Sequence, residues 1–348
     1  MAKKIREHDP LFTGTPSQAS EEETKGRPLV LSTPGTSETV LIPLLVFDPT
    51  PTTAPSPTAA IPPQAPWLVY LNQFRTNTGL EPLVEDDEWS NGGWRHSRYM
   101  VKNDYVGHSE DSGNLWYSPE GHAAAQNGNV FVASWADALD ETPIDFWMTA
   151  PFHAISMIDP QLHTTGFGIY RETIGLWKTG STLDVRRGLG SLPPGSTFPI
   201  PYPADGESTW LTAYYGGEFP DPLTSCPGYS PPTGSPIMLQ LGSGDITPQV
   251  TGYRVIANGI PVESCLFDET NYFNPDPSMQ STGRIVLNVR DAIVIMPRYP
   301  LAFGTTYTVE ISTADSTMTW SFTVDSTSAN TQSVTPSSIQ IGSVSHNK

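Results

Sequence analysis

The chain of 348 residues contains 37% hydrophobic residues, which is enough to bury at least one full core and is typical of two domains. Its 36 acidic and 18 basic residues give a formal net charge of −18, which argues against nucleic-acid binding, because phosphate contacts need clustered Lys and Arg. An acidic membrane surface is disfavoured as a partner for the same reason.

Residues 1–66 are rich in Pro, Thr, Ser and Glu, and we expect them to form a disordered segment and linker. No apolar run follows the charged residues Met1–Pro10, so no signal peptide is visible. The run Val40–Phe47 is too short to span a bilayer, and we expect no transmembrane segment. Charged residues make up only 16% of the chain, a composition that resembles exported proteins. We therefore expect a secreted or cell-surface protein, with a cytosolic location as the alternative.

The first packed element is predicted to begin at Trp67, where apolar residues start to recur at helical spacing, and to stop at Gly79. A second helix is predicted over Asp86–Lys102. Its paired glycines, including Gly93, suggest that another backbone approaches closely there. His96 lies on the apolar stripe of this helix, and we interpret it as a core residue rather than a ligand.

A third helix is predicted from Thr142 as N-cap, with Pro143 at the first helical position and Asp145 returning the capping bond. Pro151 should end or kink this helix and leave His153 just beyond the break. The strands predicted to follow are Thr165–Tyr170, Thr182–Val185 and Trp210–Tyr215.

These elements carry a set of short motifs in a fixed order. They are Leu71-Asn72-x-x-Arg75, Gly79-Leu80-x-Pro82-Leu83, His96-Ser97-x-x-Met100, Gly107-His108 and Trp147 followed six residues later by His153. Together they resemble a bacterial CAP domain, the superfamily of cysteine-rich secretory, antigen-five and pathogenesis-related proteins. The resemblance covers roughly Trp67 to Leu223. It implies an α-β-α sandwich, usually secreted, with a cleft lined by two histidines and two acidic residues.

The resemblance places the two cleft histidines at His108 and His153. The first cleft acid is replaced by Gln126 and the second by Ala150, so both acids are lost in this chain. The carboxylates that could compensate are Glu110, Glu120, Asp137 and Asp145. We therefore expect a binding cleft that contains His108, Glu110, Gln126 and His153.

The loss of both acids disfavours catalysis, because a histidine without a carboxylate partner loses the group that fixes its tautomer and raises its basicity. His108 and His153 remain the catalytic candidates of a hydrolase. Ser109 beside His108 is a poor nucleophile, since adjacent side chains rarely face one another. The same two histidines could hold a weakly bound Zn²⁺, but a tight zinc site needs three or four ligands. Simple hydrogen bonding within the cleft is the alternative, and no cofactor is required.

From Cys226 onward the chain reads as short β-branched or aromatic runs separated by turns, and Asn258-Gly259 marks a tight hairpin. The predicted strands are Ile237–Leu241, Val250–Ile256, Ile293–Met296, Tyr307–Ile311 and Thr319–Val324. The segments Pro300–Tyr307 and Trp320–Phe322 resemble the corner and closing strand of bacterial immunoglobulin-like (Ig-like) domains, which implies an all-β sandwich. Asn274-Pro275-Asp276-Pro277 offers oxygen ligands for calcium, but a plain proline-stiffened turn is the simpler interpretation.

The only cysteines are Cys226 and Cys265. If they are oxidised, they close a loop of about 39 residues, which the chain-entropy model values at about 4 kcal/mol. Two free buried thiols are the alternative.

The sequence therefore predicts an α+β protein with residues 1–66 as a disordered linker, 67–225 as a CAP domain, 226–325 as an Ig-like domain and 326–348 as a disordered tail. We expect a monomeric, non-enzymatic binding module for a lipid or other small apolar ligand, a peptide or a glycan. A metal-assisted hydrolase and a structural or adhesive surface protein are the alternatives.

Overall fold

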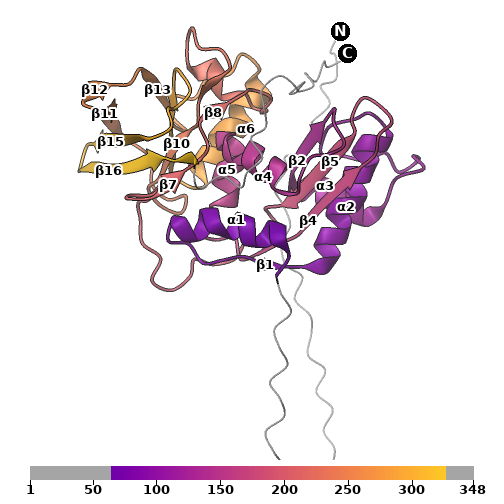
Figure 1. Ribbon diagram of the computed structural model, residues 1–348. Helices are drawn as coiled ribbons and strands as arrows, with labels where there is room; N and C mark the ends of the chain where they lie inside the picture. Colours follow the sequence, from indigo (N-terminus) through magenta and orange to yellow (C-terminus); the bar gives the residue numbers. More distant parts are fainter. Residues whose placement is uncertain (1–63, 327–348) are drawn as a thin grey trace, which may run out of the picture. The chain divides into compact units, whose positions relative to one another are not determined.

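The computed structural model describes residues 64–326 (Figure 1). The predictions for the N-terminal linker, the signal peptide and the C-terminal tail fall almost wholly on residues 1–63 and 327–348, which lie outside the described residues. Helices and strands are mixed along the described chain, which confirms the α+β class. Within this part of the chain, no helix is long and apolar enough to cross a membrane.

The helices are α1 (Pro66–Asn77), α2 (Asp87–Lys102), α3 (Pro119–Asn127), α4 (Glu141–Met148), α5 (Pro151–Met157) and α6 (Pro277–Asn288), with a 3-10 turn η1 (Pro222–Ser225). The earlier strands are β1 (Val84–Glu85), β2 (Gly128–Ala133), β3 (Thr164–Thr165), β4 (Phe167–Arg171), β5 (Thr179–Asp184), β6 (Ile200–Tyr202), β7 (Ser208–Thr209) and β8 (Ala213–Tyr214). The later strands are β9 (Thr233–Gly234), β10 (Ile237–Gln240), β11 (Val250–Ala257), β12 (Ile260–Pro261), β13 (Ser264–Phe267), β14 (Ala292–Pro297), β15 (Thr305–Thr313) and β16 (Thr317–Val324).

The first two helices lie where the sequence predicts them. Pro66 takes the first position of α1, where its missing N–H has no cost, and Gly79 follows the end with φ +76°. Asp86 caps α2, because its side chain accepts a hydrogen bond from the Trp89 backbone N–H at 3.0 Å. Both predictions are confirmed to within a residue or two.

The antiparallel sheet β2-β5-β4 lies between two helical layers (Figure 1). On one face α2 approaches so closely that a Cβ at Gly93 would lie 2.9 Å from the Gly168 nitrogen, which explains the predicted close backbone approach. On the other face the ring of Phe167 contacts Trp67 of α1 at 5.1 Å and Trp147 of α4 at 6.5 Å between centroids. Neighbouring residues of β4 thus face opposite helical layers, as strand alternation requires.

The third helix corrects two predictions. It begins at Glu141 after Asp140 rather than at a Thr142 cap, and Asp145 does not cap it, because the Asp145 carboxylate accepts the Tyr70 hydroxyl at 2.6 Å. Pro151 ends the predicted helix but also opens α5, since proline fits the first helical position. His153 therefore lies in the first turn of a helix, not just beyond one.

Two sheets dominate the later part of the chain, with strand orders β13-β14-β10-β6 and β12-β11-β15-β16-β7. A shared apolar cluster that includes Ile293, Val309 and Phe322 lies between them. The predicted hairpin at Asn258-Gly259 is confirmed, with φ +51° and +77°. The two packed sheets support the predicted sandwich, and its Ig-like character stays a prediction.

Helix α6 corrects the prediction that residues 226–325 are all β. Asp276 caps it by accepting the Ser278 N–H at 2.8 Å, and Pro277 takes its first position. The Asn274 side chain accepts the Asp276 N–H at 3.0 Å. The oxygen-rich segment considered for calcium is therefore the start of a helix.

The two sheets also draw on strands that precede the expected domain boundary at 225/226. Strand β6 pairs with β10, and β7 pairs in parallel with β16. The Arg290 guanidinium contacts the Asp159 carboxylate at 2.8 Å, and the Phe152 and Tyr272 rings lie 5.0 Å apart. The earlier and later parts of the described chain thus share one core, and the boundary itself stays a prediction.

Candidate functional site

His153 is held by a glutamate that lies 65 residues further along the chain. Its Nδ1 lies 2.8 Å from Oε1 of Glu218, and the same oxygen accepts the His153 backbone N–H at 2.9 Å. The glutamate side chain is fully buried, whereas 14% of the imidazole remains accessible. Glu218 therefore fixes both the ring of His153 and the first turn of α5, where a negative charge is favoured.

His108 lies on the loop between α2 and α3, and its Nδ1 lies 2.9 Å from the carbonyl oxygen of Ala125. A carbonyl can only accept, so Nδ1 carries the proton and Nε2 of the neutral ring keeps its lone pair. Desolvation lowers the pKa of His108 and outweighs the hydrogen bond to Ala125, which raises it. The positive charges of His153, His96 and Arg186 lower the pKa further. The ring is therefore neutral near pH 7.

The two rings share one pattern. In neutral His153, as in His108, Nδ1 donates to an oxygen acceptor, and Nε2 has no hydrogen-bond partner within residues 64–326. The charge of His153 also contributes to the lowered pKa of His108. The site thus offers two Nε2 lone pairs whose tautomers are fixed by the protein.

The buried surroundings of Glu218 disfavour a negative charge on its carboxylate. Desolvation raises its pKa, although its hydrogen bonds with His153 oppose the shift. Its second oxygen, Oε2, is buried and has no hydrogen-bond partner in the described part of the chain. The Glu218 backbone N–H donates to the Tyr214 hydroxyl at 3.4 Å, and desolvation followed by the charge of Glu218 raises the pKa of Tyr214.

Comparison with known proteins finds a family similarity in the earlier part of the described chain. The Cysteine-rich secretory protein family (CAP) matches residues 68–175, a range that contains His108 and His153. This part of the chain is similar to the CAP family. No curated protein matches the chain. One solved structure, an extracellular protein containing a SCP domain from Bacillus anthracis str. Ames, aligns with 17% identity and a TM-score of 0.28, over 35% of this chain and 39% of that one.

Glu110, expected in the cleft, instead supports the interior of the CAP-like region. Its Oε1 lies 2.9 Å from Nδ1 of His96, and its Oε2 accepts the Ser118 N–H at 3.0 Å. The Nε2 of His96 lies 2.9 Å from the Gly107 carbonyl oxygen, so both ring nitrogens are used. Both side chains of this pair have 0% exposure, which confirms His96 as a core residue.

Gln126 lies exposed at the end of α3, and its backbone carbonyl accepts a bond from Arg186 at 3.3 Å. Glu120 and Asp137 are also exposed. Asp145 is buried between Tyr70 and the Trp210 indole, and desolvation raises its pKa to about 7. None of the four carboxylates considered from the sequence forms a hydrogen bond with the ring of His108 or His153, whose partners in the described chain are Ala125 and Glu218.

Glu218 is the functional residue that sequence reasoning missed. It follows Gly216-Gly217 and precedes Phe219-Pro220, a context that reads as a turn rather than as a site. It also lies outside residues 68–175, so the CAP motifs do not point to it. No local signal in the sequence relates it to His153.

The nearby hydroxyls of the described chain are not placed for activation by His108 or His153. Ser109 lies 3.2 Å from the Tyr105 hydroxyl, and Ser156 donates to the His153 backbone carbonyl at 2.6 Å. Within residues 64–326, no hydroxyl forms a hydrogen bond with the ring of His108 or His153. Neither histidine is therefore paired with a hydroxyl nucleophile within residues 64–326, although such a pair is the usual mark of covalent catalysis.

His108 and His153 are also the residues that could hold a metal ion. The described chain contains no group of three or more His, Cys, Asp or Glu side chains arranged to hold a metal ion. The two Nε2 atoms could still provide two ligands, with each Nδ1 bound to an oxygen as metal-bound imidazoles require. The residues therefore fit an open, weak site and not a closed structural one.

Proposed function

We propose that this protein is an extracellular, CAP-type binding protein whose cleft takes a ligand through His108 and His153. One observation carries the proposal: each ring has Nδ1 fixed by an oxygen acceptor and Nε2 without a partner in the described chain. Two fixed lone pairs are a ready-made recognition element, because the protein has already ordered them before a ligand binds.

An extracellular location is supported by three features. The matching family is named for secretory proteins, and the chain has few charged residues. Cys226 and Cys265 form a disulfide, as the sequence allowed, and such bonds persist in oxidising compartments. The route of export and the monomeric state stay predictions.

The chemistry of the site favours one kind of ligand. Neutral Nε2 atoms accept hydrogen bonds, so they fit ligands that carry donors, such as the hydroxyls of a glycan or the N–H groups of a peptide. The acyl chain of a lipid has no donor and gains nothing from these atoms. Among the ligands considered from the sequence, a glycan fits the two acceptors best.

Calorimetric titration of soluble cell-wall glycan fragments into the full chain tests this proposal. We expect binding that is lost in His108→Ala and in His153→Ala. His163→Ala is the matched control, since His163 binds the Ser191 carbonyl oxygen away from the cleft. Binding that survives both cleft substitutions would contradict the proposal, as would equal binding of a fatty acid.

A second candidate function is metal-assisted hydrolysis. The observation that favours it is the oxygen partner on each Nδ1, an arrangement that raises the basicity of imidazole ligands. His108 and His153 would hold Zn²⁺, which supplies Lewis-acid chemistry when bound. Turnover of an ester or casein panel that requires Zn²⁺ and both histidines would support this function, whereas Zn²⁺-independent background rates would remove it.

A further inference from the structure

The segment that carries Glu218 is attached to the later part of the chain. Residues 216–226 lie outside the range that matches the CAP family, and their only regular structure is the short turn η1. A buried carboxylate on such a segment needs other contacts to hold it against His153. These contacts come from residues 264–274.

Tyr272 makes the first contact. Its ring is fully buried, and its hydroxyl donates to the Asp221 carbonyl oxygen at 2.9 Å, only three residues after Glu218. Desolvation raises the pKa of Tyr272, and the charge of Glu218 contributes to the same shift. The hydroxyl of Tyr272 thus holds the backbone that leads out of Glu218.

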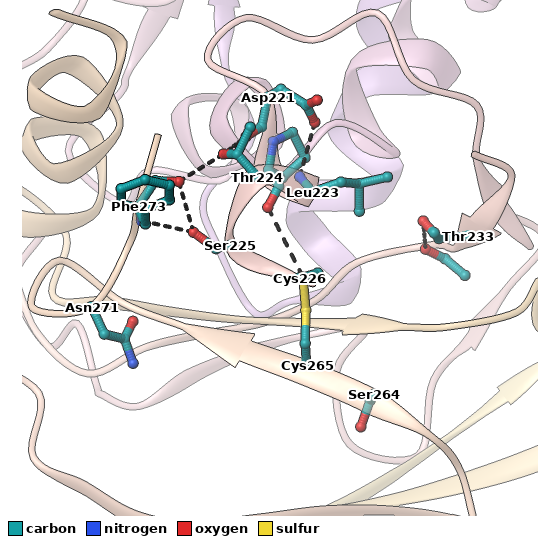
Figure 2. Close-up of a disulfide and its surroundings, with 12 residues drawn as sticks. Asp221, Leu223, Thr224, Ser225, Cys226, Thr233, Ser264, Cys265, Asn271 and Phe273 are labelled. Carbon is teal, nitrogen blue, oxygen red and sulfur yellow. Dashed lines mark hydrogen bonds between the residues drawn. A yellow bond between two sulfur atoms is a disulfide. The ribbon is translucent and has the colours of Figure 1, made fainter. Parts of the chain in front are cut away.

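Phe273 and the disulfide make the next contacts (Figure 2). The Phe273 carbonyl oxygen accepts a hydrogen bond from the Thr224 hydroxyl at 2.7 Å. The Phe273 backbone N–H donates to the Ser225 hydroxyl at 2.8 Å. Directly after these residues, Cys226 is bonded to Cys265 of β13. The Glu218 segment is therefore fastened at successive points to one stretch of the later chain.

The same stretch also packs against α5, the helix that carries His153. The ring of Phe152, next to His153 in α5, lies 5.0 Å from the ring of Tyr272 and 6.0 Å from that of Phe267. Residues 264–274 therefore pack against α5 while they hold the segment of Glu218. One stretch thus contacts the neighbour of His153 in α5 and the segment that follows Glu218.

We propose that residues 264–274 position Glu218 against His153, with Tyr272 and the Cys226–Cys265 disulfide as positioning groups of the cleft. The proposal deepens the proposed function and rests on it for the role of the pair. Its consequence is that residues 68–175, the range that matches the CAP family, do not complete the site alone. Residues 216–226, outside that range, supply the Glu218 carboxylate, and residues 264–274 hold it in place.

The test compares ring tautomers in the full chain. Long-range ¹H–¹⁵N NMR reports which nitrogen of His153 carries the proton, and a purely structural contact would not change it. We expect the Nδ1–H form in the wild type, and a gain of the Nε2–H form in Tyr272→Phe, in Cys226→Ser/Cys265→Ser and most of all in Glu218→Ala. Tyr253→Phe is the matched control, because its hydroxyl also donates to a carbonyl oxygen, that of Ser264, at 2.7 Å.

Zn²⁺ titration gives a second measure in the same proteins. Removal of a carboxylate behind a metal-bound histidine costs about 10–100-fold in affinity, which we expect for Glu218→Ala. Loss of a single hydrogen bond in Tyr272→Phe corresponds to about 2–10-fold. A folded Tyr272→Phe protein whose His153 tautomer and Zn²⁺ affinity match those of Tyr253→Phe would overturn the proposal.

The two proposals fail in different ways. If no glycan or Zn²⁺ binds but the His153 tautomer responds to Tyr272→Phe, the proposed function fails and the positioning role stands. If ligands bind through both histidines and the tautomer ignores Tyr272 and the disulfide, the proposed function stands and the positioning role fails. The conservative Tyr272→Phe change keeps the test valid even if the cysteine variant does not fold.

Discussion

Two histidine–glutamate pairs lie within the described residues, and they differ in whether the second ring nitrogen has a hydrogen-bond partner there. In the His96–Glu110 pair, Nδ1 binds the carboxylate, Nε2 binds the Gly107 carbonyl oxygen and both side chains are fully buried. In the His153–Glu218 pair, Nδ1 binds the carboxylate at a similar distance, but Nε2 has no partner in the described chain and 14% of the ring is accessible.

The comparison teaches that the pair itself does not make a site. A buried histidine and carboxylate with every atom satisfied act as an internal crosslink. The same two groups become a recognition element when one ring nitrogen is unused and solvent can reach it. The following predictions test this distinction, from the largest expected effect to the smallest.

Glu110→Ala should cost about 3–5 kcal/mol of unfolding free energy, because it leaves His96 and the Ser118 N–H buried without their acceptor. Urea denaturation measures the loss. Glu120→Ala removes an exposed glutamate of the same region and should change stability by less than about 0.5 kcal/mol. Equal losses of stability in Glu110→Ala and Glu120→Ala would contradict the structural role of the His96–Glu110 pair.

Asp145 is a carboxylate that bonds to Tyr70 and Trp210 instead of to a histidine, so Asp145→Asn shows what desolvation alone does to such a group. Desolvation raises the pKa of Asp145 from 3.8 to about 7, so the stability it contributes is present below about pH 4 and is lost as the pH rises through 7. This shift corresponds to about 4 kcal/mol.

Asparagine still accepts from Tyr70 and Trp210 but does not titrate, so the variant should gain stability over the wild type between about pH 5 and pH 9. Urea unfolding of both proteins across this range measures the gain. Parallel pH profiles would show that Asp145 keeps an ordinary pKa.

Glu218→Ala should cost roughly 1–3 kcal/mol, less than Glu110→Ala, because water can reach the ring that it leaves behind. Glu218→Gln keeps an acceptor for Nδ1 and should cost less than Glu218→Ala. Urea denaturation of the three proteins gives the ranking. A larger loss for Glu218→Ala than for Glu110→Ala would reverse our assignment of the two pairs.

His108→Ala should change the unfolding free energy by less than about 1 kcal/mol, because the ring makes a single hydrogen bond, to the Ala125 carbonyl oxygen. His96→Ala, which empties a fully buried site, should cost several times more. Thermal unfolding of both variants is the check, and similar melting temperatures would remove the distinction between them.

The sequence was sufficient wherever local chemistry determines the structure. The Asp86 cap, the Gly79 stop and the Asn258-Gly259 hairpin all follow from backbone preferences of single residues. The start of α6 carried the same kind of signal in Asp276-Pro277. Those residues also favour turns, and the strand-rich surroundings led us to the turn.

The site could be predicted only in part. His108 and His153 are candidates from the sequence because they lie in ordered motifs, whereas Glu218 reaches His153 across 65 residues and has no local signal. Asp145 was misassigned because an aspartate near a helix start suits both a cap and a buried hydrogen-bond acceptor. Long-range contacts of this kind depend on tertiary packing, which a single sequence does not show.

The most direct test of this account is long-range ¹H–¹⁵N NMR of the histidine rings in the full chain, before and after addition of Zn²⁺. We predict that His108 and His153 carry the proton on Nδ1 and that their Nε2 signals shift with Zn²⁺, while those of His96 do not move. Nε2–H tautomers at His108 and His153, or Nε2 signals that ignore Zn²⁺ as those of His96 do, would contradict the claim that the two rings present fixed lone pairs to a ligand.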